Sequence, residues 1–466
     1  MKRIVFCFDG TSNALNADTP TNVVLAAASI NRKTLDGTAQ VIYYDEGVGT
    51  GKFDTSQFIG RAASLIDKII GGGWGWGLTE NIREAYRFLI FNYDPGDEIF
   101  VFGFSRGAFT ARSFIGLVRY VGPIRRLHAA RIDEALDLYH KRVKKENQST
   151  EDIQRFRAEY STDVLVNKED EDWRVKNVQG YVAGTAKLVR IKYLGVWDTV
   201  SALGTPEAVP GSEKINTDFH FHDPSITDFI ERARHAVAID ERRVLFPPVL
   251  FGDLSKLNDL CGFTSDNVDA PYQERWFPGA HGSIGGGGDI RGLSDSALEW
   301  ILFGAKQAGL SLDVSSGTRI YGLRPDPFVP LINSTQPKKD LLSLTLYQWK
   351  TDRRGPEQMW QLSNSTLRRW KADSGDLPGD LLYRPKTLQR LSDALNKYEP
   401  KFALLVSDLL DLHVVEAGET LYELANRYYK DRTKFGVIFD ANRGVLDDAR
   451  QLSVGQELRI PKLPVA

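Results

Sequence analysis

The sequence predicts an α/β fold with a mostly parallel sheet, followed by a smaller C-terminal module. Short apolar segments alternate with longer amphipathic segments, as buried strands alternate with helices in parallel sheets. Several of the apolar segments end in polar or glycine-containing turns, which is typical of loops at the carboxyl edge of such a sheet. After about residue 400 the composition changes, and this indicates a separate unit.

Length and composition limit the classes of protein to consider. A chain of 466 residues has room for a large domain at 1–400, a linker at 401–411 and a small domain at 412–466. The formal net charge of −2 gives no signature of nucleic-acid binding, and two cysteines cannot form a disulfide framework. No segment approaches the roughly 18 apolar residues of a membrane span, and the amino terminus does not resemble a signal peptide. We therefore expect synthesis in the cytoplasm, with any export carried out by another machine.

The expected elements of the large domain follow in chain order. Apolar runs predict these strands: Arg3–Phe8, Ala39–Tyr44, Ile99–Phe102, Leu188–Trp197 and Glu274–Ala280. Helical spacing predicts helices in these ranges: Leu78–Tyr93, Phe109–Val118, Ile226–Ile239 and Pro385–Tyr398. The charged stretch 124–187 reads as a solvated helical cap insertion. An apolar stripe within 58–70, next to a glycine–tryptophan run, is typical of core packing, with a lipid-facing lid as the alternative.

The sequence Gly103-Phe104-Ser105-Arg106-Gly107 has the G-x-S-x-G pattern between an apolar run and a helical stretch. Glycines on both sides of a serine allow a sharp strand-to-helix turn because they lack Cβ atoms. Such a turn exposes the serine hydroxyl at a helix amino terminus, where backbone N–H groups can stabilise an oxyanion. We interpret Ser105 as a nucleophile, with a plain glycine-rich turn as the alternative.

A nucleophilic serine needs a histidine base and a carboxylate that orients it. Asp198 directly follows the apolar strand predicted at Leu188–Trp197, which makes it the candidate carboxylate. Its alternative role is a helix cap. His281 follows a strand and leads into a glycine run, so a loop can direct it toward Ser105. His235 is the other candidate base, although its expected helical position favours a structural role. His220 and His222 alternate in sequence, but no ligand cluster accompanies them, and we expect no metal and no cofactor.

Oxyanion donors are expected near the serine. The N–H of Arg106 is one candidate, and Gly10 and Thr11, at the end of the first strand, are candidates for a second donor. A simple helix cap explains Gly10 and Thr11 equally well. The glycine-containing loop 46–52 does not fit a phosphate-binding loop, because Glu46 and Phe53 stand where that pattern needs glycine and Ser or Thr.

Five motifs occur in an order that resembles a known family: FDGTSN (8–13), GFSRGAFTAR (103–112), GVWDTV (195–200), HAVAIDERR (235–243) and WFPGAHGSIGGG (276–287). They resemble the α/β-hydrolase family of type VI secretion phospholipase effectors of the first lipase class, over roughly 1–395. The resemblance implies an esterase or phospholipase that uses Ser105, Asp198 and His281. Ser283 and Ser12 depart from the family pattern, which bears on loop geometry and substrate choice.

The tail resembles a LysM module with a βααβ fold. The resemblance rests on VVxxGETL from Val414 to Leu421, on Ala441-Asn442, and on LxxGQxLxIP from Leu452 to Pro461. Such modules bind glycans that contain N-acetylglucosamine. The resemblance places the groove at these residues: Gly418, Glu419, Thr420, Leu421 and Asn442. Docking to a secretion apparatus is the alternative role for the module.

These features favour a serine lipolytic enzyme that cleaves carboxylic esters of lipids. The family resemblance implies an antibacterial effector delivered to the periplasm of a target cell, with an immunity protein as a further partner. Two other functions fit the sequence. One is an inactive hydrolase fold that serves as a glycan-binding or scaffold protein, and the other is an intracellular esterase in defence against phage.

Overall fold

The computed structural model describes these residues: 1–10, 18–34, 36–47, 73–143, 150–201, 225–244, 246–313, 323–333, 350–398, 409–442, 446, 448–450, 452–461 and 463. The stripe within 58–70, the loop residues after Gly47, Thr11, Ser12 and the pair His220 and His222 lie outside this part of the chain. No helix within the described residues is both long and apolar enough to cross a bilayer.

A six-stranded sheet forms the centre of the large domain, with the strand order β2-β1-β3-β6-β7-β8 and parallel pairing throughout. Its strands are β1 (Arg3–Phe8), β2 (Gln40–Asp45), β3 (Glu98–Phe104), β6 (Ile191–Trp197), β7 (Ala233–Ala238) and β8 (Tyr272–Phe277). The predicted α/β fold is therefore confirmed. Because all six strands run the same way, their carboxyl ends meet at one edge.

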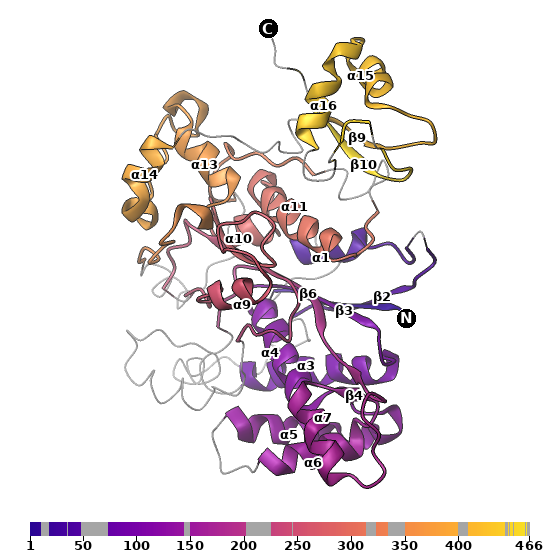
Figure 1. Ribbon diagram of the computed structural model, residues 1–466. Helices are drawn as coiled ribbons and strands as arrows, with labels where there is room; N and C mark the ends of the chain where they lie inside the picture. Colours follow the sequence, from indigo (N-terminus) through magenta and orange to yellow (C-terminus); the bar gives the residue numbers. More distant parts are fainter. Residues whose placement is uncertain are drawn as a thin grey trace.

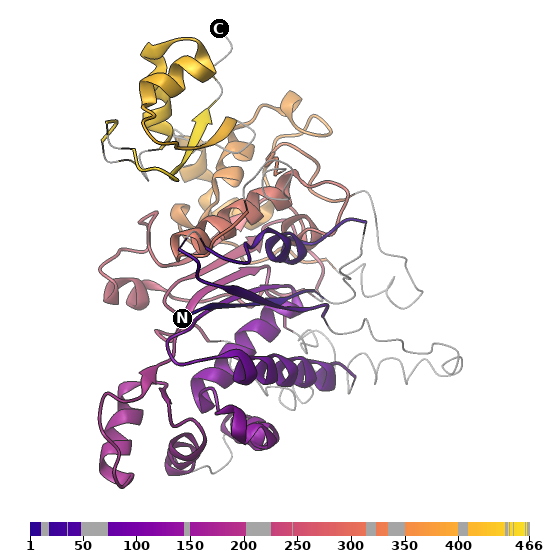
Figure 2. The same ribbon diagram turned by 90° about the vertical axis from the view of Figure 1, so that its right-hand side faces the viewer.

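Helices cover both faces of the sheet, as Figure 1 shows, and Figure 2 presents the same layers from the side. On one face lie α3 (Gly73–Asn92) and α4 (Arg106–Val121), which pack against Phe6 and Phe8 of β1. On the other face lie α1 (Asn22–Ser29) and α11 (Gly292–Gln307), which pack against Val5 and Cys7. The alternating side chains of β1 thus enter two separate cores, as a strand covered on both faces requires. Burial raises the pKa of the Cys7 thiol, consistent with a core residue.

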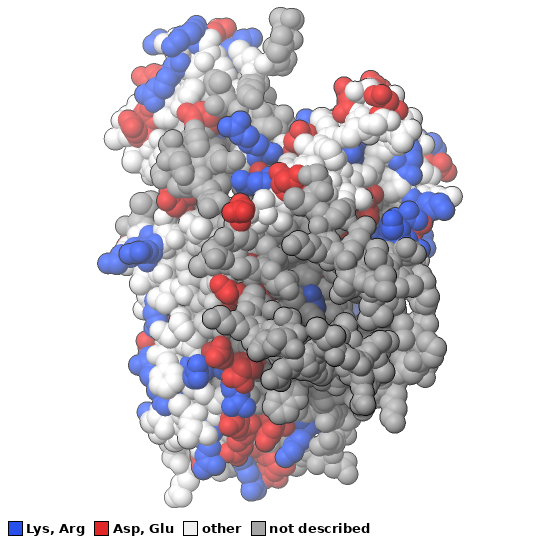
Figure 3. Space-filling model, turned by 180° about the vertical axis from the view of Figure 1, so that it is seen from behind, with Lys and Arg blue, Asp and Glu red and all other residues white. Residues whose placement is uncertain are grey.

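The charged insertion after α4 forms an outer layer on α4 and α3. Its elements are η2 (Arg126–Arg131), α5 (Ile132–Val143), α6 (Thr150–Tyr160), β4 (Val164–Leu165), α7 (Lys168–Asn177) and β5 (Lys187–Leu188). The hydroxyl of Tyr139 donates to the carbonyl of Ser113 across this contact (3.3 Å). The lower end of the molecule, where these helices lie, shows acidic and basic side chains interspersed (Figure 3), as expected for a solvated surface.

The helix predicted at Ile226–Ile239 is wrong. Residues 233–238 form strand β7, between β6 and β8, and every residue of this strand is buried. Apolar residues recur at helical spacing within Ile226–Ile239, and periodicity alone does not distinguish a short buried strand in such a stretch from a buried helix. Three alanines within Ala233–Ala238 strengthen the helical appearance, but hydrogen bonds to the two neighbouring strands decide the structure.

The region after α11 packs beside β7 and β8 around Trp276 and Trp370. It contains η3 (Met359–Gln361), α13 (Asn364–Lys371), η4 (Ser374–Asp376), η5 (Lys386–Leu391) and α14 (Ser392–Lys397). Two short helices, α9 (Ser255–Leu260) and α10 (His281–Gly285), flank β8 in sequence.

The C-terminal unit has the expected βααβ order. An antiparallel pair, β9 (Leu409–Val414) and β10 (Glu457–Pro461), frames α15 (Leu421–Tyr429), η7 (Arg432–Lys434) and α16 (Phe435–Ala441). The unit has a hydrophobic cluster of its own, from Val415 to Ile460. Strand β9 begins inside the stretch 401–411, of which residues 401–408 are not described. Lys306 of α11 forms an ion pair with Glu457 of β10 (2.8 Å).

Candidate active site

Ser105 occupies the turn between β3 and α4 in a backbone conformation that L-residues rarely adopt, with φ 59° and ψ −126°. The flanking glycines allow this turn. A Cβ at Gly103 would lie 2.7 Å from the Cα of Ala108, and one at Gly107 would lie 2.3 Å from the carbonyl oxygen of Asp9. The serine is therefore held at the carboxyl edge of the sheet by close backbone contacts that only glycine permits.

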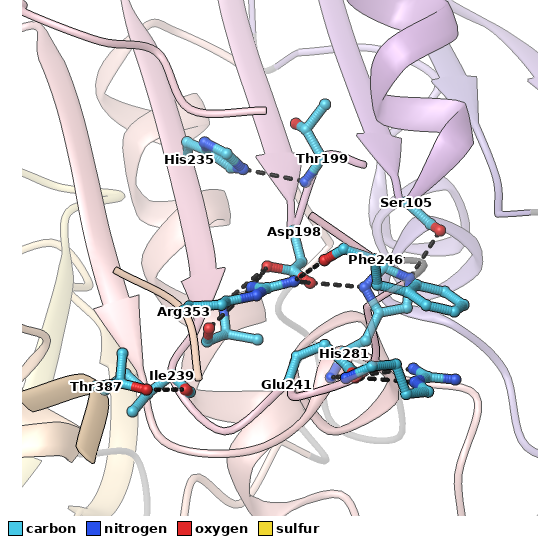
Figure 4. A network of polar contacts seen from close by, with 12 residues as sticks. Ser105, Asp198, Thr199, His235, Ile239, Glu241, Phe246, His281, Arg353 and Thr387 are labelled. Atoms are coloured by element: carbon cyan, nitrogen blue, oxygen red, sulfur yellow. Dashed lines mark hydrogen bonds and ion pairs between the residues drawn. The ribbon is translucent and has the colours of Figure 1, made fainter. Parts of the chain in front are cut away.

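Ser105, His281 and Asp198 meet at this edge, as Figure 4 shows. The Oγ of Ser105 lies 2.7 Å from Nε2 of His281, and Nδ1 of the same ring lies 2.6 Å from Oδ2 of Asp198. Phe104 pairs with Trp197 in the register of β3 and β6, so the next residues, Ser105 and Asp198, leave neighbouring strands together. Residues 105, 198 and 281 are far apart in sequence, and the parallel sheet brings them to one place.

The protonation of the His281 ring follows from its partners. Burial would raise the pKa of Asp198, but the charge of Arg353 and hydrogen bonds from His281 and Arg353 outweigh burial and hold that pKa well below its usual range. Asp198 is therefore ionised and accepts a proton donated by Nδ1. Nε2 then carries no proton and accepts from the Ser105 hydroxyl. Burial also lowers the pKa of His281, although Asp198 opposes this effect, so the ring is neutral at pH 7.

Arg353, which the sequence analysis did not identify, binds Asp198 through both guanidinium NH2 groups. Nη1 lies 2.6 Å from Oδ1 and Nη2 lies 3.0 Å from Oδ2. The N–H of Ala238 also donates to Oδ1 (2.9 Å). Figure 4 shows the Arg353 guanidinium and the His281 ring facing the Asp198 carboxylate. Arg353 stands in the irregular segment TDRRGP, and no local pattern distinguishes it from its neighbour Arg354.

The loop after β7 fixes His281 from the other side. The carboxylate of Glu241 accepts the backbone N–H of His281 (3.2 Å) and is itself paired with Arg243. The rings of Phe104 and Phe246 lie 4.8 and 5.0 Å from the His281 ring. Contacts to both the backbone and the ring therefore limit the movement of this side chain.

His235 belongs to a separate buried network beside the triad. Its Nε2 accepts the backbone N–H of Thr199 (3.1 Å), and its Nδ1 lies 2.9 Å from the carboxylate of Glu274. A backbone N–H can only donate, so Nε2 is unprotonated and Nδ1 carries the proton. His235 thus supports the turn that follows Asp198. This arrangement matches the structural role favoured for it, on a strand and not on a helix.

The expected oxyanion donors have different surroundings. Arg106 is the first residue of α4 and follows Ser105 directly. The N–H of Gly10 donates to the carboxylate of Asp9 (2.6 Å), which also accepts hydrogen bonds from Thr21 (2.7 Å) and Tyr44 (2.8 Å). The Gly10 N–H is therefore already engaged. Thr11 lies outside the described residues.

The residues proposed for the glycan groove have structural contacts in the C-terminal unit. Leu421 is fully buried, and the Asn442 side chain bonds the backbone of Ile438 and Arg459. Thr420 caps α15 in a reciprocal pair with Glu423. Glu419 lies 2.6 Å from Nε2 of His413 and 2.7 Å from Arg427, and Gly418 forms a turn with φ 86°. The motif residues of the described part of the module therefore stabilise its fold.

No cluster of three or more His, Cys, Asp or Glu side chains suited to a metal ion occurs within the described residues.

Comparison with known proteins adds the following. The model of the T6SS phospholipase effector Tle1-like catalytic domain matches residues 2–303, and a LysM domain model matches 413–461. An uncharacterized protein of Saccharomyces cerevisiae is 26% identical over 268 residues, which cover 57% of this chain and 35% of the yeast protein.

Two solved structures are also similar. An uncharacterized protein from Pseudomonas aeruginosa has 19% identity and a TM-score of 0.37, covering 70% of this chain and 49% of that one. The Tle1 effector bound to the VgrG spike of the type VI secretion system has 17% identity and a TM-score of 0.28. The match covers 61% of this chain and 51% of that one. The chain thus spans about a third of the yeast relative and about half of each solved protein. The match to the catalytic-domain model, at residues 2–303, includes more than half of this chain, and a LysM domain follows it. The chain therefore belongs to the family of Tle1-like phospholipase effectors of the type VI secretion system.

Proposed function

We propose that this protein is a serine esterase that cleaves carboxylic ester bonds of phospholipids. The observation that carries the proposal is the continuous relay from the Ser105 hydroxyl through the His281 ring to Asp198, at 2.7 and 2.6 Å. A hydroxyl, a neutral imidazole and an ionised carboxylate in this order make up the machinery of acyl transfer to serine. The family to which the chain belongs supports lipid as the substrate class.

The reaction follows from the protonation states. Oγ of Ser105 attacks the ester carbonyl and its proton passes to Nε2 of His281, while Asp198 stabilises the imidazolium. Nε2 then returns the proton to the leaving alcohol oxygen as its bond to the carbonyl carbon breaks. Water hydrolyses the acyl-serine by the same steps in reverse. We assign the N–H of Arg106 as one oxyanion donor and keep the N–H of Thr11 as the candidate for the second.

The proposed setting is delivery by a type VI secretion system to the periplasm of a target bacterium, where phospholipid is the substrate. An immunity protein in the producing cell would then be a partner. An intracellular esterase in phage defence would use the same chemistry. Toxicity in a recipient cell that depends on Ser105 and on contact with a producer supports delivery, and phage restriction without contact supports the alternative.

Hydrolysis of a panel of phospholipids by the wild type and by Ser105→Ala tests the enzymatic proposal. We expect the variant to lose several orders of magnitude in kcat, and a fluorophosphonate probe to label only the protein that carries Ser105. Ser283→Ala is the matched control, because this serine lies two residues after His281 but donates to the carbonyl of Leu331 (2.8 Å). A wild type without labelling or turnover would support the inactive scaffold.

For the LysM domain we propose binding of glycans that contain N-acetylglucosamine. The favouring observation is the half-exposed Tyr422, whose ring stacks on Phe435 with centroids 4.2 Å apart. A rigid aromatic face of this kind suits the apolar face of a sugar ring. Sedimentation with purified peptidoglycan sacculi tests binding. Binding to the secretion apparatus in place of sacculi would favour the docking role.

A further inference from the structure

Arg353 lies fifty residues beyond the end of the family match at residue 303, yet its guanidinium contacts the carboxylate of the triad. Both of its NH2 groups are shared between Asp198 and the backbone. Nη1 also donates to the carbonyl of Ala238 (2.8 Å), and Nη2 donates to that of Phe246 (2.8 Å). The side chain is only 5% exposed. Planar, two-point binding of this kind fixes the orientation of a carboxylate and also compensates its negative charge.

The segment that carries Arg353 is attached to the loop that holds His281. Lys350 forms an antiparallel bridge with Arg243, and the N–H of Thr351 donates to the carbonyl of Arg242 (2.8 Å). Glu241, which binds the backbone of His281, belongs to the same loop. The acid and the base are therefore positioned by two neighbouring segments that are bonded to each other.

We propose that Arg353 is a positioning residue for the reaction, which fixes the plane of the Asp198 carboxylate and offsets its charge so that His281 stays a neutral base. This inference rests on the proposed function of Ser105, His281 and Asp198. Arg353 acts through Asp198 and not on the substrate.

The electrostatic part of the inference can be worked out from the charges that surround His281. Burial, the largest effect, disfavours the imidazolium, and Arg243 acts in the same direction, whereas Asp198 and Glu241 favour it. Arg353 adds a positive charge behind Asp198. Without it, the full charge of Asp198 would act on the ring, the imidazolium would be more stable, and the base would be lost at a higher pH. The carboxylate would also be free to rotate.

The test is the pH dependence of kcat/KM for Arg353→Met and Arg353→Lys, measured with an ester substrate. We expect Arg353→Met to lose about 10- to 100-fold in kcat, since small misplacements of catalytic groups have effects of this size. Its acid limb should move upward by about one pH unit. Arg353→Lys keeps the charge but not the planar contact, so its kcat should fall while its acid limb stays in place.

Arg354→Met is the matched control, because this neighbouring arginine is 80% exposed and pairs with Glu357. It should behave as the wild type. Arg353 also lines a cavity of about 610 Å³, so a small solute in that cavity would lie beside the position of its guanidinium. Guanidinium ions should therefore restore part of the activity of Arg353→Ala but none of that of Ser105→Ala.

The outcomes separate the two proposals. If Arg353→Met has wild-type kcat/KM and an unmoved acid limb, the inference on Arg353 is overturned while activity that depends on Ser105 stands. If the wild type has no such activity, the enzymatic proposal fails instead. In that case NMR titration of the His281 ring in the wild type, Arg353→Lys and Arg353→Met still tests whether the charge of Arg353 acts on the ring. Equal pKa values of His281 in all three proteins would contradict the charge argument.

Discussion

The ring of Phe104 occupies the space that a side chain at Gly285 would need. A Cβ built on Gly285 would lie 1.9 Å from Cε2 of that ring. Phe104 also lies beside the ring of His281, with centroids 4.8 Å apart. The absence of a side chain at Gly285 thus lets the aromatic ring of Phe104 pack beside the imidazole.

We expect Gly285→Ala to push Phe104 against His281 and to reduce kcat by about 100-fold, the size of effect that displaced catalytic groups produce. Gly282→Ala is the control in the same short helix, since its new Cβ would meet its nearest neighbour, Asn333, at 3.8 Å. Kinetics on both purified variants checks the prediction. Equal activity of the two would mean that Phe104 does not transmit the displacement.

The position of Ser105, Asp198 and His281 at the carboxyl edge of the sheet could be predicted from the sequence, because each follows a short apolar run. In a parallel sheet all strands end at the same edge, so residues that directly follow different strands are expected to lie close together. Strand β7 could not be assigned in this way. Its buried, alanine-rich sequence suits a helix equally well, and pairing with β6 and β8 decides the outcome.

Arg353 could not be found from the sequence for a different reason. Its partner Asp198 is 155 positions away, and the segment has no regular structure whose period would indicate a facing side chain. The adjacent Arg354 has the same chemistry and points to solvent. In the C-terminal unit the motif residues were identifiable, but patterns do not separate side chains that bind a ligand from those, such as Leu421, that form the core.

The lowered pKa of His281 predicts activity that persists into mildly acidic solution. Burial disfavours the imidazolium, so the neutral ring that accepts the serine proton remains at a pH below the usual titration range. Activity should fall as the pH drops through this lowered pKa, and the midpoint of the acid limb of kcat/KM should lie below about 6.5. A midpoint above that value would contradict the dominance of burial.

The strained backbone of Ser105 predicts that glycine at this position stabilises the fold. A residue in such a conformation costs about 1–3 kcal/mol, and glycine avoids the cost. Ser105→Gly should therefore have a free energy of unfolding about 1 kcal/mol greater than Ser105→Ala, since both variants lack the hydroxyl. Denaturant unfolding measures the difference. At Ser113, within α4, the order of the glycine and alanine variants should be reversed.

The network around His235 predicts an effect on stability with little effect on chemistry. Oε2 of Glu274 accepts from the His235 ring and from the N–H of Phe251 (2.6 Å), and both groups are buried. Glu274→Gln keeps an acceptor but loses the charge, which should lower the free energy of unfolding by about 1–3 kcal/mol. The rate of fluorophosphonate labelling at Ser105 should stay within a few-fold of the wild type. A large fall in labelling with the fold intact would give His235 a role in catalysis.

The partly exposed aromatic pair Tyr422 and Phe435 of the LysM domain gives the last prediction. Tyr422 presents one face to Phe435, while nearly half of its surface is exposed to solvent. Tyr422→Ala should reduce binding to sacculi by about tenfold, because a stacking aromatic contact contributes about 1–1.5 kcal/mol. Tyr429→Phe is the control, since that hydroxyl donates to the carbonyl of Pro461 within the domain (2.7 Å). Lipid hydrolysis by Tyr422→Ala in detergent solution should be unchanged, because the triad lies in the other domain. Unaltered binding to sacculi in the same variant would place the glycan contact elsewhere on the module.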